Sequence, residues 1–148
     1  MRLYLIRHGQ ATDESVNPDR PLTDGGRRDV AALASQLQAA GLVPYQFLHS
    51  GKTRASQTAE ILNGRLRAPA GVDRGKGLKP NDPPDAIVAR IETWQEDTAL
   101  VGHLPSLAII ARALMGPGLP FTEFPVAGAV VLERDAAGHW RLLAQFAP

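Results

Sequence analysis

The chain has 148 residues without a single cysteine, and its positive and negative charges nearly cancel. Without thiols it can form no disulfide bridge, no thiolate-bound metal site and no cysteine nucleophile. A formal net charge of +1 gives no overall positive field to hold nucleic acid or anionic lipid, although a local cationic pocket is compatible with it. We therefore expect neither nucleic acid nor a membrane among the partners.

Long apolar runs are also absent. No segment reaches the length of about 20 apolar residues that a membrane-spanning helix requires, and no signal-like apolar region precedes the first expected strand. By elimination we expect a soluble, cytoplasmic protein. Aromatic residues make up only 5% of the chain, but apolar residues of all kinds make up 44% and charged residues 21%, as in ordinary globular proteins. The length predicts one domain, residues 1–148.

Apolar segments with strand and helix spacing alternate along the chain. Strands are predicted over 3–6, 45–49, 70–73 and 98–101, and helices over 23–40, 53–63, from 83 onward and over 105–114. Residues 126–134 and 139–146 are typical of a closing hairpin. This order predicts an α/β fold: a three-layer α/β/α sandwich with a mostly parallel, mixed central sheet and a late antiparallel hairpin.

Cationic and imidazole side chains follow three of the predicted strands. Arg7 and His8 come directly after the first, Arg54 lies just beyond the second, and His103 follows a later one. Ligands of such sheets bind beyond the carboxyl ends of the strands. We therefore expect these four side chains to converge on an anion, and arginine forks match phosphate oxygens well. The helix after His103 would add its N-terminal amide groups.

Each residue alone also has a structural explanation. Arg7 could extend from a strand end into solvent, a single histidine such as His8 is more often structural than catalytic, and His103 could cap the following helix. The agreement of three strand ends favours the functional interpretation.

The motifs "LIRHGQA", "RPLTDGGRRDV", "HSGKTRASQTAEIL" and "LVGHLPSL" resemble, in order, those of the histidine phosphatase superfamily, which includes the phosphoglycerate mutases. The short chain, "RPLT", "GHLP" and "FPVAGAVVLE" are most similar to the SixA-type phosphohistidine phosphatases. The resemblance spans nearly the whole chain and is weakest over 64–97. It implies a phosphoglycerate mutase-like fold.

The resemblance implies that His8 is the nucleophile and that Arg7, Arg54 and His103 hold the phosphoryl group. Simple chemistry supports these roles, because the attacking histidine must be neutral and nearby cations lower its pKa. The same cations offset charge on the oxygens during in-line transfer. No metal or other cofactor is expected.

Further residues are expected around this site. Arg20 resembles a residue at the substrate mouth, although a solvated loop arginine is an equal alternative; Gly9 and Leu104 are also expected to contact substrate. We expect Ser50 to shape a turn and Thr58 to pack or hydrogen-bond locally.

A proton-donating carboxylate is missing from its usual place. Many relatives carry a glutamate after the third strand, whereas this chain has Gly77 there. Asp82 could substitute as proton donor, although capping the helix at Pro83 is the other explanation. An alkoxide leaving group gains about 10²–10⁴-fold from a donor. Protonated phosphohistidine leaves as neutral imidazole and needs little further help.

The sequence thus predicts a phosphatase that acts, through phospho-His8, on a protein carrying phosphohistidine. A small-molecule phosphomonoesterase is the alternative, and a non-catalytic phosphate-binding module or a mutase is favoured less. Only residues 64–85 are available beside the site, so we expect an open pocket. Lys76 and Lys79 could meet an acidic partner there, or belong to a solvated loop.

Overall fold

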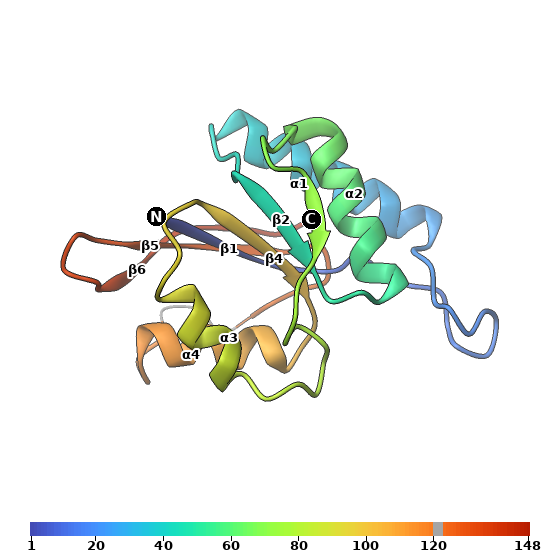
Figure 1. Ribbon diagram of the computed structural model, residues 1–148. Helices are drawn as coiled ribbons and strands as arrows, with labels where there is room; N and C mark the ends of the chain where they lie inside the picture. Colours follow the sequence, from blue (N-terminus) through green and yellow to red (C-terminus); the bar gives the residue numbers. More distant parts are fainter. Residues whose placement is uncertain (120–122) are drawn as a thin grey trace.

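The computed structural model describes residues 1–119 and 123–148, and its centre is a six-stranded sheet (Figure 1). The order of the strands is β3-β2-β4-β1-β5-β6. Strands β1 to β4 are parallel, whereas β5 pairs antiparallel with β1, and β6 pairs antiparallel with β5 to form a hairpin. Their bounds are Arg2–Arg7 (β1), Gln46–His49 (β2), Val72–Arg74 (β3), Thr98–Gly102 (β4), Ala129–Arg134 (β5) and Trp140–Phe146 (β6).

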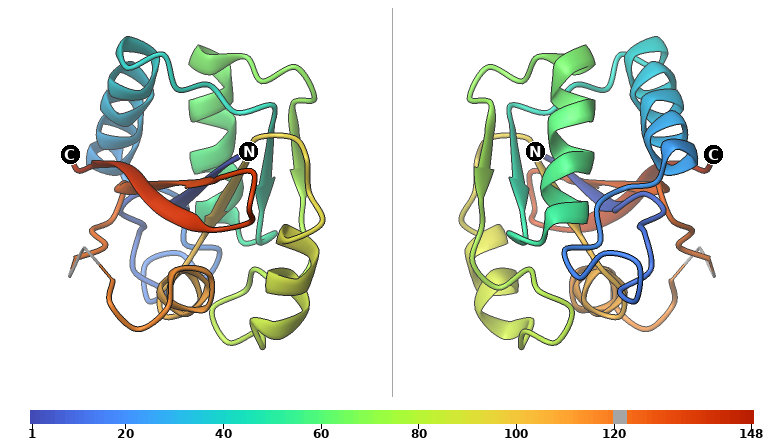
Figure 2. Two further views of the ribbon diagram at one scale, coloured as in Figure 1. Left: turned by 90° about the vertical axis from the view of Figure 1, so that its left-hand side faces the viewer. Right: turned by 90° about the vertical axis from the view of Figure 1, so that its right-hand side faces the viewer.

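Helices cover both faces of the sheet (Figures 1 and 2). Helices α1 (Asp24–Ala39) and α2 (Thr53–Leu66) lie on one face, and α3 (Asp85–Ile91) and α4 (Ser106–Met115) lie on the other. The predicted three-layer sandwich with a late hairpin is confirmed. None of the described helices combines the length and apolar character needed to cross a bilayer.

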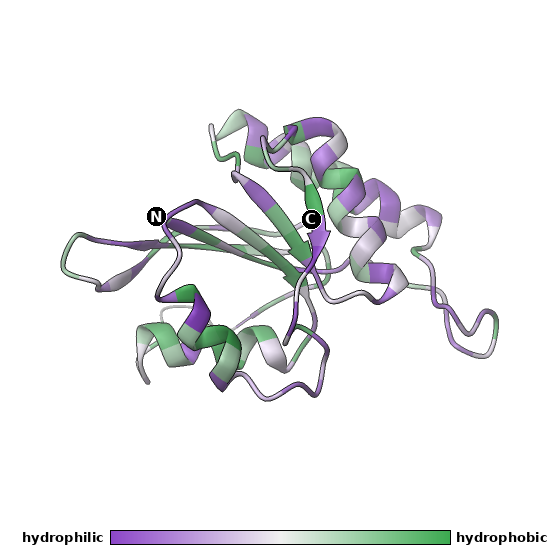
Figure 3. Cartoon of the chain, in the orientation of Figure 1, coloured by the Kyte–Doolittle hydropathy of each residue, from purple (hydrophilic) through white to green (hydrophobic). Residues whose placement is uncertain are grey.

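The apolar core is divided by the sheet into two clusters. Along β1, Tyr4 and Ile6 pack with α1 and α2, while Leu3 and Leu5 pack with α3 and α4. All four side chains are fully buried, and the strands at the centre of Figure 3 are correspondingly hydrophobic. Burying such a side chain contributes about 1.5–3 kcal/mol. The buried strand β1 therefore holds Arg7 and His8, at its carboxyl end, in a fixed position.

Helix α1 follows the sequence prediction closely. The Thr23 hydroxyl accepts a hydrogen bond from the Gly26 amide at 2.9 Å and so caps the first turn. Val30 and Leu37 lie on the buried face. The helix ends before Gly41, whose φ of +69° is a left-handed conformation that glycine adopts at little cost.

Helix α2 extends beyond its predicted end. It passes through Gly64 and ends at Leu66, with Arg67 in the left-handed conformation donating its amide to the Asn63 carbonyl. A glycine inside a helix costs about 1 kcal/mol, but burial of Leu66 against the core offsets it. Tertiary packing, rather than the glycine, decides where this helix ends.

The expected helix start at Pro83 is wrong by two residues. Helix α3 begins at Asp85, and no side chain caps it at Pro84. The Asp82 carboxylate instead accepts a hydrogen bond from the Lys79 amide at 3.0 Å. The Asp82 carboxylate, which was expected to cap α3, is therefore used in a local turn with Lys79.

Candidate active site

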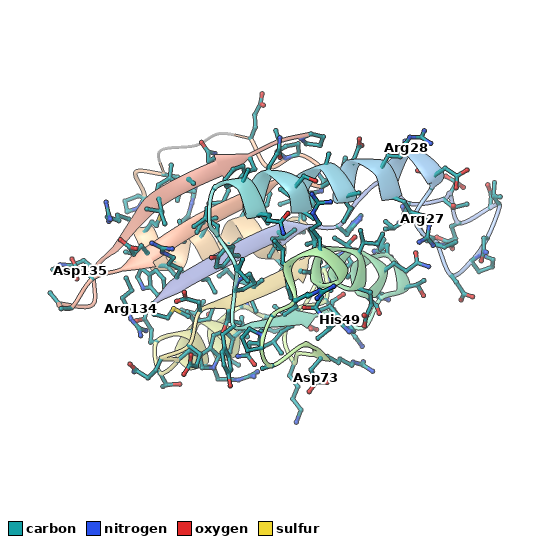
Figure 4. All side chains as sticks on the ribbon, turned by 90° about the horizontal axis from the view of Figure 1, so that it is seen from above. Arg27, Arg28, His49, Asp73, Arg134 and Asp135 are labelled. Carbon is teal, nitrogen blue, oxygen red and sulfur yellow. The ribbon has the colours of Figure 1, made fainter. Side chains whose placement is uncertain are left out.

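The carboxyl ends of β1 and β4 and the first turn of α2, which follows β2, open onto one cavity of about 370 Å³. In Figure 4, His49 marks this end of β2, and Arg134 and Asp135 lie at the opposite end of the sheet. The cavity brings together the four residues expected to converge, together with Arg20 and Leu104. Its lining consists of Arg7, His8, Gln10, Ala11, Arg20, Arg54, Pro80, His103, Leu104 and Val126.

Strand register brings the two histidines together. Arg7 lies opposite Gly102 in the parallel pair of β1 and β4, so His8 and His103 leave the sheet side by side. The His8 amide donates to the Gly102 carbonyl at 3.1 Å, and the His8 carbonyl accepts from the Ala127 amide at 3.0 Å. The two rings have centroids 5.0 Å apart and are tilted by 53°.

One contact fixes the tautomer of His8. Its Nδ1 atom lies 2.7 Å from the Gly9 carbonyl oxygen. A carbonyl can only accept a hydrogen bond, so Nδ1 carries the proton and the neutral ring keeps its lone pair on Nε2. His8 therefore has the form that a nucleophile requires.

Gly9, which was expected to contact substrate, is not among the residues that line the cavity. Its backbone instead holds the loop that carries His8. Its amide donates to the Thr58 hydroxyl at 3.1 Å, and that hydroxyl donates to the Arg54 carbonyl at 2.8 Å. A Cβ atom at position 9 would lie only 2.8 Å from a methyl group of Val30, so the close approach requires glycine. Thr58, expected to pack or hydrogen-bond locally, does bond to Arg54 within its helix, and it also joins the loop that carries His8 to that helix.

Two buried arginine atoms have no partner among the described residues: Nε of Arg7 and Nε of Arg54. Arg7 is anchored by donation from Nη1 to the Phe124 carbonyl at 2.9 Å. Burial, and then the nearby Arg20 cation, lower the pKa of Arg54. No ion pair among the described residues involves these three arginines. The cavity therefore holds positive charge that forms no ion pair with a carboxylate of the described residues.

Arg20 reaches the cavity from the loop before α1. Its φ is +49°, a left-handed conformation that costs a non-glycine residue about 1–3 kcal/mol. The Arg20 amide donates to the Asn17 carbonyl at 3.0 Å, and Nε donates to the Thr12 carbonyl at 3.2 Å. These bonds hold the guanidinium at the cavity, which favours the substrate-mouth interpretation over a solvated loop residue.

His103 is 2% exposed, and its Nε2 atom lies 2.6 Å from the hydroxyl oxygen of Ser50. Ser50 does shape a turn, because the Lys52 amide donates to the same oxygen at 3.3 Å. Its contact with His103 was not predicted. The partners are 53 residues apart in sequence, but His49 lies opposite Val101 in the register of β2 and β4.

Both cavity histidines are neutral at pH 7. Burial is the largest cause that lowers the pKa of His8 to about 4; the Gly9 bond opposes it, and the Arg54, Arg7 and Arg20 cations add to it. Burial also leads in lowering the pKa of His103 to about 3, followed by His8 and the Arg54, Lys52 and Arg20 cations. The free Nε2 of His8 is thus available as a nucleophile at neutral pH.

Over residues 1–119 and 123–148, no aspartate or glutamate lines the cavity. Of the described residues between β3 and α3, Pro80 is the one in the lining. Gly77 has a φ of +81° and faces Ile87, and the Asp82 carboxylate is engaged by the Lys79 amide. The role of Asp82 as proton donor stays a prediction. In the described part of the chain, no three histidine, aspartate or glutamate side chains gather as a metal site would require.

Comparison with known proteins identifies the family. Residues 3–76 match the histidine phosphatase superfamily (branch 1). The chain belongs to this superfamily, as the sequence motifs predicted. An uncharacterized protein of Picosynechococcus is 37% identical over 121 residues, which cover 77% of this chain and 73% of that protein. The human mitochondrial serine/threonine-protein phosphatase PGAM5 is 34% identical over 105 residues, which cover 67% of this chain but 36% of PGAM5.

Solved structures extend the likeness to the whole chain. The protein histidine phosphatase SixA complexed with tungstate has a TM-score of 0.88 and 25% identity, covering 100% of this chain and 97% of SixA. The putative phosphohistidine phosphatase SixA from Agrobacterium tumefaciens has a TM-score of 0.84 and 25% identity, covering 99% and 97%. The predicted SixA-like, phosphoglycerate mutase-like fold is confirmed, and membership of the superfamily supports phosphatase activity.

Proposed function

We propose that the protein hydrolyses phosphohistidine carried by another protein, through a phosphoryl intermediate on His8. The observation that carries this proposal is the cavity lining. It combines arginines and neutral imidazoles with no described carboxylate, so it suits a leaving group that departs without a protein acid.

In the first step, the Nε2 lone pair of His8 forms a bond to phosphorus while the bond from phosphorus to the substrate imidazole breaks. The substrate reacts with its other ring nitrogen protonated and so leaves as neutral imidazole. Arg7, Arg54 and His103 bind the transferring group, and the arginines offset the charge on its equatorial oxygens.

In the second step, water attacks phospho-His8. Nδ1 of His8 keeps its proton and donates it in a hydrogen bond to the Gly9 carbonyl. The phosphorylated ring is therefore already protonated and departs as neutral His8. The protons of the attacking water remain on the inorganic phosphate. Both steps balance without a carboxylic acid, which is why the missing glutamate does not oppose this reaction.

The comparisons support the same substrate class. The SixA structures, named as a protein histidine phosphatase and a putative phosphohistidine phosphatase, cover nearly the whole chain. The cavity opens beside the short segment 75–84 rather than beneath a large inserted domain, so a histidine on a protein surface could reach His8.

A second candidate is hydrolysis of phosphoserine or phosphothreonine on proteins, because the PGAM5 relatives are serine/threonine-protein phosphatases. These esters have alkoxide leaving groups, which lose about 10²–10⁴-fold without a proton donor. The cavity therefore favours phosphohistidine over phosphoserine.

A substrate panel without added metal tests the proposal. A phosphohistidine-containing phosphotransfer protein, a phosphoserine peptide and a sugar phosphate are compared at equal concentration, with His8→Ala as the blank. We expect the phosphohistidine protein to give the largest kcat/KM. A clear preference for either ester would overturn the proposed substrate, and absence of turnover on all three would favour a phosphate-binding module.

A further inference from the structure

Ser50 lies against the second histidine of the site and is 1% exposed. Its hydroxyl oxygen has two described partners, the His103 Nε2 atom at 2.6 Å and the Lys52 amide at 3.3 Å. The amide can only donate, so it occupies one of the lone pairs of Ser50. The position of the serine proton then decides the tautomer of His103.

Two assignments of the short Ser50–His103 contact are conceivable. If Nε2–H donated to the oxygen, both described partners of the hydroxyl would be donors, and its own buried proton would have no acceptor among the described residues. A buried polar group left unsatisfied costs about 1–3 kcal/mol. If the hydroxyl donates to Nε2, every atom of the contact is satisfied. Hydrogen-bond accounting therefore selects the second assignment.

We propose that Ser50 is a positioning residue that holds neutral His103 in the tautomer with its proton on Nδ1, so that His103 offers an N–H donor to the transferred phosphoryl group. This inference rests on the proposed function for its role in the reaction. Nδ1 is the one ring nitrogen left for a ligand, since Nε2 is taken by Ser50. It is buried without a partner among the described residues, as expected of a donor reserved for substrate.

The two histidines then have complementary roles set by their neighbours. The Gly9 carbonyl keeps the proton of His8 on Nδ1 and leaves a lone pair on the nucleophilic Nε2. The Ser50 hydroxyl donates to the lone pair on Nε2 of His103, so the ring proton lies on Nδ1 as an N–H donor. The opposite tautomer of His103 would present a lone pair to the anionic phosphoryl oxygens and repel them.

The first test is the tautomer itself, read from the ring ¹⁵N shifts and two- and three-bond couplings of His103 in the phosphate-free wild-type protein at pH 7. We expect the pattern of the Nδ1–H form. The pattern of the Nε2–H form would overturn the proposal. This readout does not depend on any substrate, so it stands apart from failure of the proposed function.

The second test compares Ser50→Ala with Ser106→Ala. Ser106 is matched as a control because it is 2% exposed, begins α4 three residues after His103, and its hydroxyl has no partner among the described residues. We expect Ser50→Ala to lose the Nδ1–H preference and to lower kcat for phosphohistidine about 10- to 100-fold, by analogy with the loss of a partner that orients a metal-bound histidine. Ser106→Ala should retain both.

An unchanged His103 tautomer together with an unchanged kcat in folded Ser50→Ala would contradict the positioning role. If Ser50→Ala does not fold, the wild-type spectrum alone decides the tautomer. If phosphohistidine is not hydrolysed but the spectrum shows Nδ1–H, the tautomer assignment stands and the proposed function fails.

Discussion

Strand β1 carries an arginine at each end, and the fold surrounds the two differently. Arg2 forms an ion pair with Glu133 at 3.2 Å, and its side chain is 38% exposed. Arg7 contacts a backbone carbonyl, and its Nε atom is buried without a described partner. One end of the strand thus has its charge balanced by a carboxylate, while the other keeps positive charge beside two neutral histidines.

The two ends of the whole sheet differ in charge pairing in the same way. At the end marked by Arg134 and Asp135 in Figure 4, Arg134 donates to the carbonyls of Ile91, Glu92 and Trp94, at the end of α3 and just beyond it. Arg141 pairs with Glu133. At the opposite end, no carboxylate of the described residues lines the cavity that holds Arg7, Arg20 and Arg54. Charge pairing at the first end is therefore structural, whereas the unpaired arginines at the other end suit the binding of an anion.

The largest effect is expected from His8→Ala. Removal of the nucleophile should reduce phosphohistidine hydrolysis to background, whereas the core of β1 stays intact and the protein folds. Activity and thermal unfolding of the variant are measured together. His139→Ala is the control, because that side chain is 83% exposed on the hairpin and should leave both unchanged. Appreciable turnover by folded His8→Ala would exclude the proposed intermediate.

The next prediction compares the loss of activity when the arginine at each end of β1 is removed. Arg7→Ala should lower kcat/KM about 10²–10³-fold, as loss of a donor to a developing anion typically does. Arg2→Ala should leave kcat/KM unchanged and cost about 0–1 kcal/mol of unfolding free energy, because its ion pair is exposed. Steady-state kinetics and urea unfolding of both variants check this. Similar losses of kcat/KM in the two variants would show that the two ends of β1 do not differ in function.

A third prediction concerns pH. The pKa of His8 is lowered to about 4 in the folded protein, whereas the unfolded chain has an ordinary value near 6.5. The unfolded state therefore binds more protons between these values, and stability falls as the pH is lowered from about 6.5 towards 4. Urea unfolding should show the wild type losing stability relative to His8→Ala over this window. A difference that stays constant with pH would show that His8 is not shifted.

The smallest effect is expected from Asp82→Asn. Because the carboxylate accepts from the Lys79 amide and does not line the cavity, kcat/KM for phosphohistidine should change less than about twofold. The asparagine side-chain oxygen can accept the same hydrogen bond. A large loss that is confined to phosphate esters would instead identify Asp82 as a proton donor for those substrates.

The sequence was most informative where chemistry follows directly from a strand. Arg7, His8 and His103 could be placed together because the ends of parallel strands meet at one edge of the sheet. The sandwich and the hairpin were likewise predictable from the alternation of apolar segments. These features depend on local spacing, which a single sequence shows directly.

Contacts across the fold could not be predicted in this way. The bond from Ser50 to His103 depends on the register of β2 against β4, and the bond from Gly9 to Thr58 joins residues 49 apart. The end of α2 depends on burial of Leu66. Each outcome is decided by packing between distant segments, and local residue preferences do not reveal it.

The most direct test of the account is to trap the phosphoenzyme. The protein is mixed with a phosphohistidine donor, quenched in alkali and digested with trypsin. Cleavage after Arg7 and Arg27, with the bond before Pro21 resistant, releases residues 8–27, in which His8 is the one histidine. We expect an acid-labile, alkali-stable phosphoryl group on this peptide, and none in His8→Ala. Phosphate that is acid-stable, or found on another peptide, would contradict it.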